Sequence, residues 1–244
     1  MPNTDDSSDP HTSERLLLLV GDSDIERWPE KFYPCLQGAG ASTAVDSHGN
    51  SFFSLSGHSG ATLGQVLIHL RDALEDARGA ADRKSPTIIL VVCAGENDIG
   101  MGVSLETTKV NFSALLDLVF SDQIVAGSGG DLTHFIFLGP KFEPWMEYDN
   151  DSVGMKQAYA KLDRAFQRLC DEYAKRHENL SSNIHYIDCL DMFCGDTSNL
   201  PGARTGGRAV AKEEFFCSDQ LHLSDDGYAV WKETVERIIK KKCL

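Results

Sequence analysis

The sequence predicts an α/β fold in which a parallel sheet is covered by helices on both faces. Short apolar runs alternate with longer segments of helical periodicity along most of the chain. The runs are hydrophobic at nearly every position, which is typical of strands buried on both faces. Strands that alternate with helices form βαβ units, and such units build a parallel sheet.

The individual elements follow in order along the chain. The apolar runs that predict strands are Leu16 to Val20, a weaker run Ser51 to Leu55, Thr87 to Cys93, Thr133 to Leu138 and Asn183 to Ile187. The helix-period segments are about Thr62 to Arg78, Leu105 to Phe120, Val153 to Arg176 and Asp225 to Lys241, with Ser224 as the expected cap of the last one. Residues 1–13 are polar and acidic, so we expect a disordered tail before a single domain over residues 14–244.

Composition narrows the classes of function. The 244 residues carry 37 acidic and 23 basic side chains, a net charge of -14, which repels phosphate backbones and anionic lipid headgroups. We therefore expect neither a nucleic-acid nor a membrane partner. The N-terminus lacks the basic and apolar regions of a secretory signal, so we expect a cytoplasmic chain. The seven cysteines include no CxxC pair, which indicates reduced thiols and neither a disulfide framework nor a zinc site.

Polar segments follow the predicted strands at the edge where parallel α/β sheets bind ligands. These segments are Gly21-Asp22-Ser23, Gly57-His58-Ser59-Gly60 and Gly95-Glu96-Asn97-Asp98, and the segment Asp219-Gln220-Leu221-His222 precedes the last helix. Because the carboxyl ends of parallel strands share one edge, we expect the four segments to converge.

The convergent residues permit nucleophilic chemistry. Ser23 follows a strand and enters a turn, where it is either a nucleophile or a helix cap. Asp219 and His222, three residues apart, supply a carboxylate and an imidazole on one face of a helical turn, or else a solvated helix start. Asn97 and Gly60 are candidate donors to an oxyanion, although both residue types are also common in turns.

The four blocks, in this order and spacing, resemble the SGNH or GDSL family of serine hydrolases along nearly the whole chain. The resemblance implies Ser23 as nucleophile, His222 as base and Asp219 as its partner. It also implies an oxyanion hole formed by the Ser23 N–H, the Gly60 N–H and the Asn97 side chain, with Gly57 as a less favoured alternative to Gly60. The implied fold is a flavodoxin-like three-layer α/β/α sandwich with five parallel strands in the order 2-1-3-4-5.

Two residues depart from the pattern of that family. Asp24 stands where the family usually has Leu or Ile, and Leu223 stands where proline often follows the histidine. Neither change removes a catalytic group. Asp24 either pairs with Arg27 on a helix surface or faces Ser23, where its charge would oppose an oxyanion.

Specificity must come from loops beside these blocks. Trp28, Phe142 and Trp145 are candidate substrate contacts, with core packing as the alternative for each. Arg204 and Arg208 lie in the glycine-rich segment Cys194 to Ser218, where they are either solvated or close to a substrate anion.

The predicted function is hydrolysis of small carboxylic esters with short acyl groups through an acyl-enzyme on Ser23. A binding or scaffolding protein of the same fold and an acyltransferase are the alternatives. We expect no metal or organic cofactor, because the sequence contains no HExxH, Walker A or GxGxxG motif. The G-x-S-x-G elbow of the α/β-hydrolases is also absent. The sequence does not indicate an oligomeric state.

Overall fold

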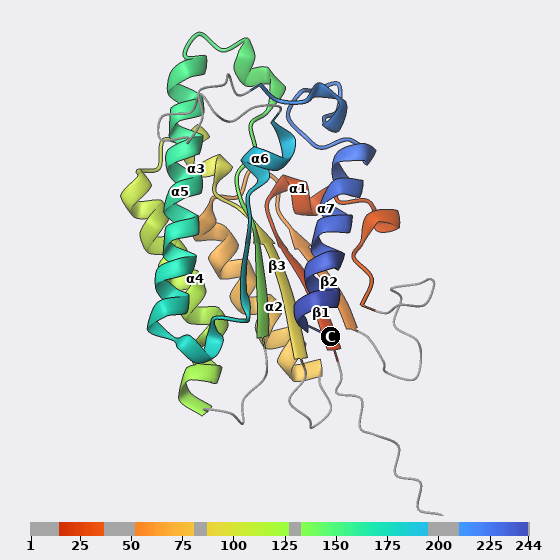
Figure 1. Ribbon diagram of the computed structural model, residues 1–244, viewed down its shortest axis with the longest axis vertical. Helices are drawn as coiled ribbons and strands as arrows, with labels where there is room; N and C mark the ends of the chain where they lie inside the picture. Colours follow the sequence, from red (N-terminus) through yellow and green to blue (C-terminus); the bar gives the residue numbers. More distant parts are fainter. Residues whose placement is uncertain (1–14, 37–51, 81–86, 127–132, 195–209, 244) are drawn as a thin grey trace, which may run out of the picture.

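Five parallel strands form the centre of the structure, in the order β2-β1-β3-β4-β5 (Figure 1). A computed structural model describes residues 15–36, 52–80, 87–126, 133–194 and 210–243. The strands are β1 (Arg15–Gly21), β2 (Phe52–Gly57), β3 (Thr87–Cys93), β4 (Thr133–Leu138) and β5 (Ile184–Ile187). This strand order confirms the three-layer fold predicted from the sequence. The predicted tail and Arg204 and Arg208 lie outside the described residues.

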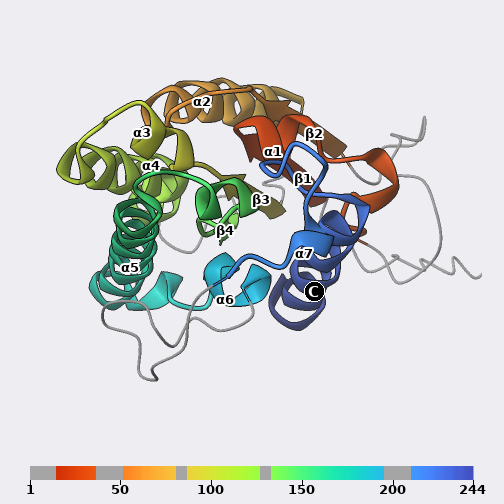
Figure 2. The same cartoon turned by 90° about the horizontal axis from the view of Figure 1, so that it is seen from above.

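Helices cover both faces of the sheet, which gives the three layers seen from above in Figure 2. The longer helices are α2 (Leu63–Ala80), α4 (Leu105–Ala126), α5 (Ser152–Arg176) and α7 (Asp225–Ile238), and the short ones are α1 (Ser23–Glu26), α3 (Glu96–Gly100) and α6 (Cys189–Phe193). One core cluster joins the sheet to α2, α4 and α5, and the other joins it mainly to α1, α6 and α7.

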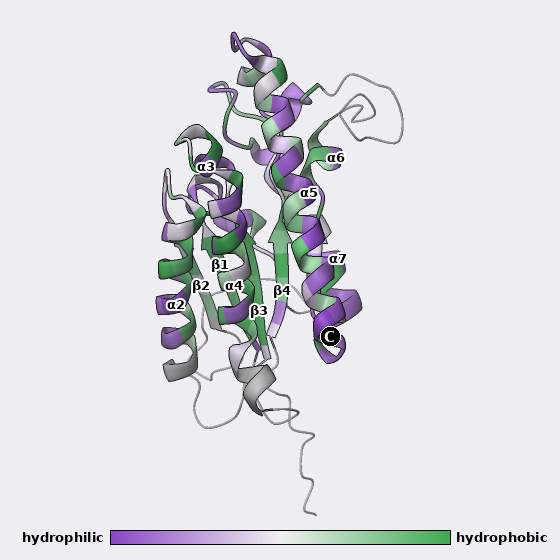
Figure 3. Cartoon of the chain, turned by 90° about the vertical axis from the view of Figure 1, so that its left-hand side faces the viewer, coloured by the Kyte–Doolittle hydropathy of each residue, from purple (hydrophilic) through white to green (hydrophobic). Residues whose placement is uncertain are grey.

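Burial on both faces explains the strand sequences. Alternate residues of β1 enter the two clusters, with Leu17 and Leu19 on one side and Leu16 and Leu18 on the other. All seven residues of β3 are buried. The strands are accordingly hydrophobic along their length, whereas the helices combine apolar and polar faces (Figure 3). Among the described helices, none combines the length and the apolarity that a bilayer-spanning segment needs.

The predicted element boundaries need small corrections. β2 runs to Gly57, so this glycine pairs with Gly21 inside the sheet instead of following the strand. The last α-helix ends at Ile238 and continues as a π-helical turn, Ile239–Cys243. Ser224 caps α7 as predicted, because its side chain accepts a hydrogen bond from the Gly227 N–H.

The buried carboxyl of Asp163 should make the stability of the protein depend on pH. It is 6% exposed on α5, and burial, with a contribution from Asp188, raises the pKa of its carboxyl to about 7, although the Tyr186 hydroxyl donates to it at 2.5 Å. The folded state thus binds this proton more tightly than the unfolded state does. The stabilising contribution of the protonated acid is greatest below about pH 4 and is lost as the pH rises toward 7.

We expect Asp163→Asn to raise the free energy of unfolding at about pH 8 by a few kcal/mol relative to the wild type, and by less at about pH 5. The amide keeps an acceptor for Tyr186 and removes the cost of a buried charge. Urea denaturation at both pH values measures the difference. A variant that is destabilised more at about pH 8 than at about pH 5 would show that the ionised carboxylate is stabilising and would contradict this prediction.

Candidate active site

Ser23 lies at the start of the short helix α1, directly after the central strand β1. Asp22 is the N-cap, and its Oδ1 accepts a hydrogen bond from the Asp24 N–H at 3.1 Å. The sequence alternative in which Ser23 serves as the cap is therefore wrong. The serine hydroxyl is left for another partner, and its N–H belongs to the first turn, where helix N–H groups lack helical acceptors.

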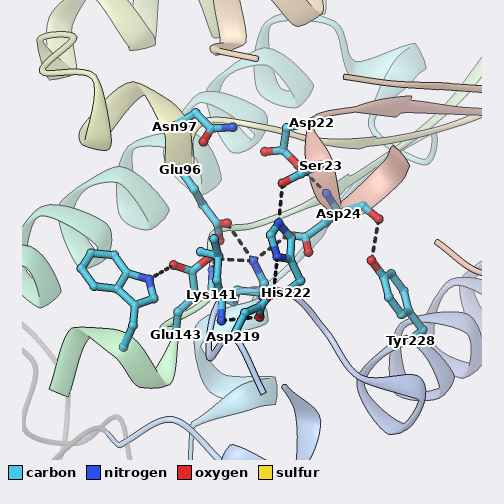
Figure 4. Close-up of polar contacts among 12 residues, drawn as sticks. Asp22, Ser23, Asp24, Glu96, Asn97, Lys141, Glu143, Asp219, His222 and Tyr228 are labelled. Carbon is cyan, nitrogen blue, oxygen red and sulfur yellow. Dashed lines mark hydrogen bonds and ion pairs between the residues drawn. The ribbon is translucent and has the colours of Figure 1, made fainter. Parts of the chain in front are cut away.

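His222 is that partner of the hydroxyl. Its Nε2 lies 3.2 Å from Ser23 Oγ, and its Nδ1 lies 2.7 Å from Asp219 Oδ2 (Figure 4). The other carboxylate oxygen of Asp219 accepts the His222 backbone N–H at 3.0 Å. The serine, imidazole and carboxylate predicted from the sequence thus lie within hydrogen-bonding distance in a row.

The turn that carries this carboxylate and imidazole has an unusual backbone. Gln220 has a φ of 58°, in the left-handed region that non-glycine residues rarely adopt. Its carbonyl accepts a hydrogen bond from the Trp145 N–H at 3.3 Å, which links the turn to the loop after β4. Strain of this kind is common at functional sites.

The Asp219 carboxylate is held in its charged form. Burial opposes ionisation, but hydrogen bonds from His222 and from the Leu221 N–H outweigh it and lower the pKa of Asp219 to about 2. Arg27 lies 3.7 Å from the same carboxylate. Arg27 therefore approaches Asp219 and not Asp24, its partner in one of the two sequence expectations.

Asn97 also reaches the site. Its side-chain amide donates to the Ala61 carbonyl at 3.1 Å and lines the same cavity as Ser23 and His222. A primary amide carries two N–H bonds, so this contact fixes the group and leaves a second donor. The next residue, Asp98, is buried and accepts the Leu63 N–H at 2.7 Å and the Thr108 hydroxyl at 3.1 Å. Asp98 thus ties α3 to the starts of α2 and α4.

The two candidate glycines differ in their surroundings. Gly60 has a φ of 73°, which favours glycine, and a Cβ there would meet only Met101 Cε, at 4.0 Å. A Cβ at Gly57 would lie 2.1 Å from the Glu26 backbone nitrogen. Gly57 is therefore required for the close packing of β2 against α1. Gly60 is not among the residues that line the cavity beside Ser23.

A buried lysine, which sequence reasoning missed, joins α1 and α3 to the loop after β4. Lys141 is 1% exposed, and its Nζ lies 2.6 Å from Asp24, 2.8 Å from Glu96 and 3.1 Å from Glu143. Its backbone N–H also donates to Glu96 at 2.6 Å. These carboxylates follow β1, β3 and β4 respectively in the chain, and Figure 4 shows them around Lys141. The sequence offered one signal for this cluster. Asp24 and Glu96 are adjacent to the predicted site residues Ser23 and Asn97, and a lysine follows a predicted strand.

The charged groups in this cluster lie close enough to shift one another's pKa. Burial alone would lower the pKa of the Lys141 ammonium, but the three carboxylates raise it well above its usual value. Burial raises the pKa of Glu143 well above its usual range, despite the nearby ammonium. Burial, with Asp24 and Glu96, does the same to Asp22. Lys141 therefore stays charged, while burial opposes the ionisation of Asp22 and Glu143.

Both sequence expectations for Asp24 are wrong. It is 2% exposed and binds Lys141, so it is neither a surface partner of Arg27 nor an uncompensated charge facing Ser23. Its backbone carbonyl accepts a hydrogen bond from the Tyr228 hydroxyl at 2.9 Å, which connects α7 to the turn that carries Ser23.

The cavity beside Ser23 has a volume of about 130 Å³. Of the three aromatic candidates, only Trp145 lines it, and its indole N–H donates to Glu143 at 2.6 Å. Trp28 and Phe142 are 2% and 0% exposed and belong to the core, which is the alternative considered for both. The remaining walls come from four acidic residues and from residues of α3, α5 and the turn before His222: Asp22, Asp24, Glu96, Glu143, Gly100, Met155, Tyr159 and Leu221.

The three-layer fold around a parallel five-stranded sheet is the one implied by the resemblance to the SGNH hydrolases. Residues 19–230 match the GDSL-like Lipase/Acylhydrolase family, and the chain belongs to that family. No curated protein matches the chain.

Solved structures share the fold at low sequence identity. The carbohydrate acetylesterase Est24 from Sinorhizobium meliloti is 13% identical, with a TM-score of 0.53 over 93% of this chain and 98% of that one. A lipase from a goat rumen metagenome is 14% identical, with a TM-score of 0.54 over 93% of this chain and 97% of that one. At such identities the likeness is one of fold alone.

Proposed function

We propose that the protein hydrolyses small carboxylic esters through an acyl-enzyme on Ser23. His222 Nε2 removes the hydroxyl proton as Ser23 Oγ attacks the ester carbonyl, and the same imidazole returns the proton to the leaving alcohol. Asp219 holds the imidazole through Nδ1 and stabilises its protonated form. Water then attacks the acyl group by the same route and releases the acid.

The single observation that carries this proposal is the row from Ser23 Oγ to His222 Nε2, at 3.2 Å, and from His222 Nδ1 to Asp219 Oδ2, at 2.7 Å. Asn97 and the N–H of Ser23 are the donors proposed for the oxyanion, and Gly60 is the third. Each well-placed donor contributes about 3 kcal/mol to such a transition state.

The cavity favours a short acyl group. Its volume of about 130 Å³ leaves little room for a long chain, and four acidic residues contribute to its wall. An apolar chain would have to displace the hydration of these groups without forming hydrogen bonds in return, which is unfavourable. The cavity walls support an acetyl-sized acyl group and a small alcohol as the substrate class.

A series of p-nitrophenyl esters, from acetate to long-chain acyl groups, tests this specificity. We expect kcat/KM to be highest for the shortest chains and to fall as the chain lengthens. Trp145→Ala, which enlarges the cavity, should move the optimum toward longer chains. Ser23→Ala provides the background rate for each ester. An optimum at long acyl chains in the wild type would overturn the proposed specificity.

A fluorophosphonate probe tests the nucleophile without assuming a substrate. It should label the wild type at one serine, Ser23, and should not label Ser23→Ala. A folded wild type that remains unlabelled would favour the binding or scaffolding alternative. Product analysis with added alcohols separates hydrolysis from acyl transfer.

A further inference from the structure

Three metal-ligating side chains meet at the end of the sheet opposite Ser23. His134 is the second residue of β4, His185 is the second residue of β5, and Cys243 ends the π-helical turn after α7. Figure 1 shows the C-terminal end of the chain near the beginnings of the strands, whereas α1 and α6 lie beyond their carboxyl ends. The group is therefore separate from the site built around Ser23.

The strand register brings the two histidines together. His185 pairs with Ile136, two residues after His134, so both side chains project from the same face of the sheet. Their rings are nearly parallel, at 14°, with centroids 6.2 Å apart. One ring nitrogen from each histidine and the Cys243 Sγ all lie within 4.8 Å of one another.

Both imidazoles have a nitrogen that needs a partner. His134 Nδ1 and His185 Nε2 are buried and have no hydrogen-bond partner among the described residues. Buried polar atoms are normally satisfied, so each such nitrogen requires an explanation. A single ion held between the rings and the thiolate would satisfy both nitrogens at once.

We propose that His134, His185 and Cys243 form a binding site for a divalent transition-metal ion, with Zn²⁺ as the expected occupant. Imidazole nitrogen and thiolate sulfur are preferred ligands of zinc, and three protein ligands leave the fourth tetrahedral position to water. On binding, the Cys243 thiol releases its proton to solvent and becomes the thiolate ligand.

The surroundings exclude hard cations from this site. Arg15 lies near Cys243 and Lys242 lies near His185, and no carboxylate belongs to the described cluster. Ca²⁺ and Mg²⁺ need oxygen ligands and would be repelled by the two cations. Only an ion with strong affinity for nitrogen and sulfur can offset that repulsion.

This proposal departs from the expectation that no zinc site is present. That expectation rested on cysteine spacing, which detects sites whose ligands are close in sequence. Here the ligands come from two strands and the last turn of the chain, and only the fold brings them together. A bound ion would join β4 and β5 to the end of α7.

The test is zinc binding by the full chain after treatment with a chelator, measured by competition with a chromophoric zinc indicator. We expect one tight equivalent per chain and a higher melting temperature with zinc than without it. Co²⁺ in place of zinc should give the charge-transfer absorption of a cobalt–thiolate bond. Ca²⁺ should produce none of these effects.

Variants assign the ligands. Cys243→Ala should weaken zinc binding at least about tenfold and abolish the thiolate absorption, and it alters only the last described turn, so folding should persist. His134→Asn should weaken binding to a similar extent. Cys217→Ser, which changes an exposed thiol near the catalytic turn, and His222→Asn should both keep the tight equivalent. Absence of a tight equivalent, or its loss in His222→Asn with retention in Cys243→Ala, would overturn the proposal.

Discussion

Replacing Ser23 with alanine should lower kcat for ester hydrolysis by about a million-fold, and His222→Ala should have nearly the same effect. The two changes are similar because the hydroxyl is a weak nucleophile without the base, and the base has no proton to remove without the hydroxyl. Asp219→Asn should lower kcat about ten-thousandfold, because an amide N–H facing His222 Nδ1 favours the wrong imidazole tautomer and no longer stabilises the protonated ring. Steady-state kinetics with p-nitrophenyl acetate measure all three.

The double variant Ser23→Ala/His222→Ala tests whether Ser23 and His222 act as a unit. If the residues act as a unit, it should be no slower than either single variant. Additive losses would contradict the relay from Ser23 to His222. A His222→Ala variant that keeps most of the activity would contradict the role of the 3.2 Å contact between Ser23 Oγ and His222 Nε2.

The second large effect is expected at Lys141. Replacing it with methionine should lower the free energy of unfolding by about 3–5 kcal/mol, because removing one partner of a buried ion cluster leaves charges uncompensated. Asp24 and Glu96 would then lie in the core without the ammonium that now binds both. Chemical denaturation measures the loss, and activity should fall as the turns after β1 and β3 separate.

Two control variants make this result specific. Lys109→Met removes an exposed pair with Glu106 and should change stability by less than about 1 kcal/mol. Glu143→Gln should cost less than Lys141→Met, because Asp24 and Glu96 still bind the ammonium; a cost remains, since the amide turns its NH2 group toward a donor, Lys141 or Trp145. Equal stability of Lys141→Met and the wild type would contradict the role given to the ammonium.

The sequence predicted the sheet well because burial on both faces has a simple signature. Nearly every residue of β1, β3 and β4 is apolar, so the predicted limits agree with the observed strands to within a residue. β2 was weaker in the sequence because it is an edge strand in which Ser54 and Ser56 interrupt the apolar pattern.

The placement of Ser23, Asn97, Asp219 and His222 also followed from the sequence, because each belongs to a short motif at a strand or helix end. The cluster around Lys141 could not be predicted from the sequence. A lysine is rarely buried, and nothing near Lys141 in the chain shows that carboxylates from three other positions will surround it. Trp28 and Phe142 were ambiguous for a related reason, since an aromatic side chain beside a site suits a substrate wall and a core equally.

The Ser23 oxygen and the His222 nitrogen that contact each other belong to residues 199 positions apart. During synthesis Ser23, the proposed nucleophile, leaves the ribosome long before His222, its proposed base. A chain that ends before Asp219 contains all five strands, yet it has neither the His222 imidazole nor the Tyr228 hydroxyl that donates to the Asp24 carbonyl after β1. Premature termination before residue 219 should therefore yield products without esterase activity, however well their sheets assemble.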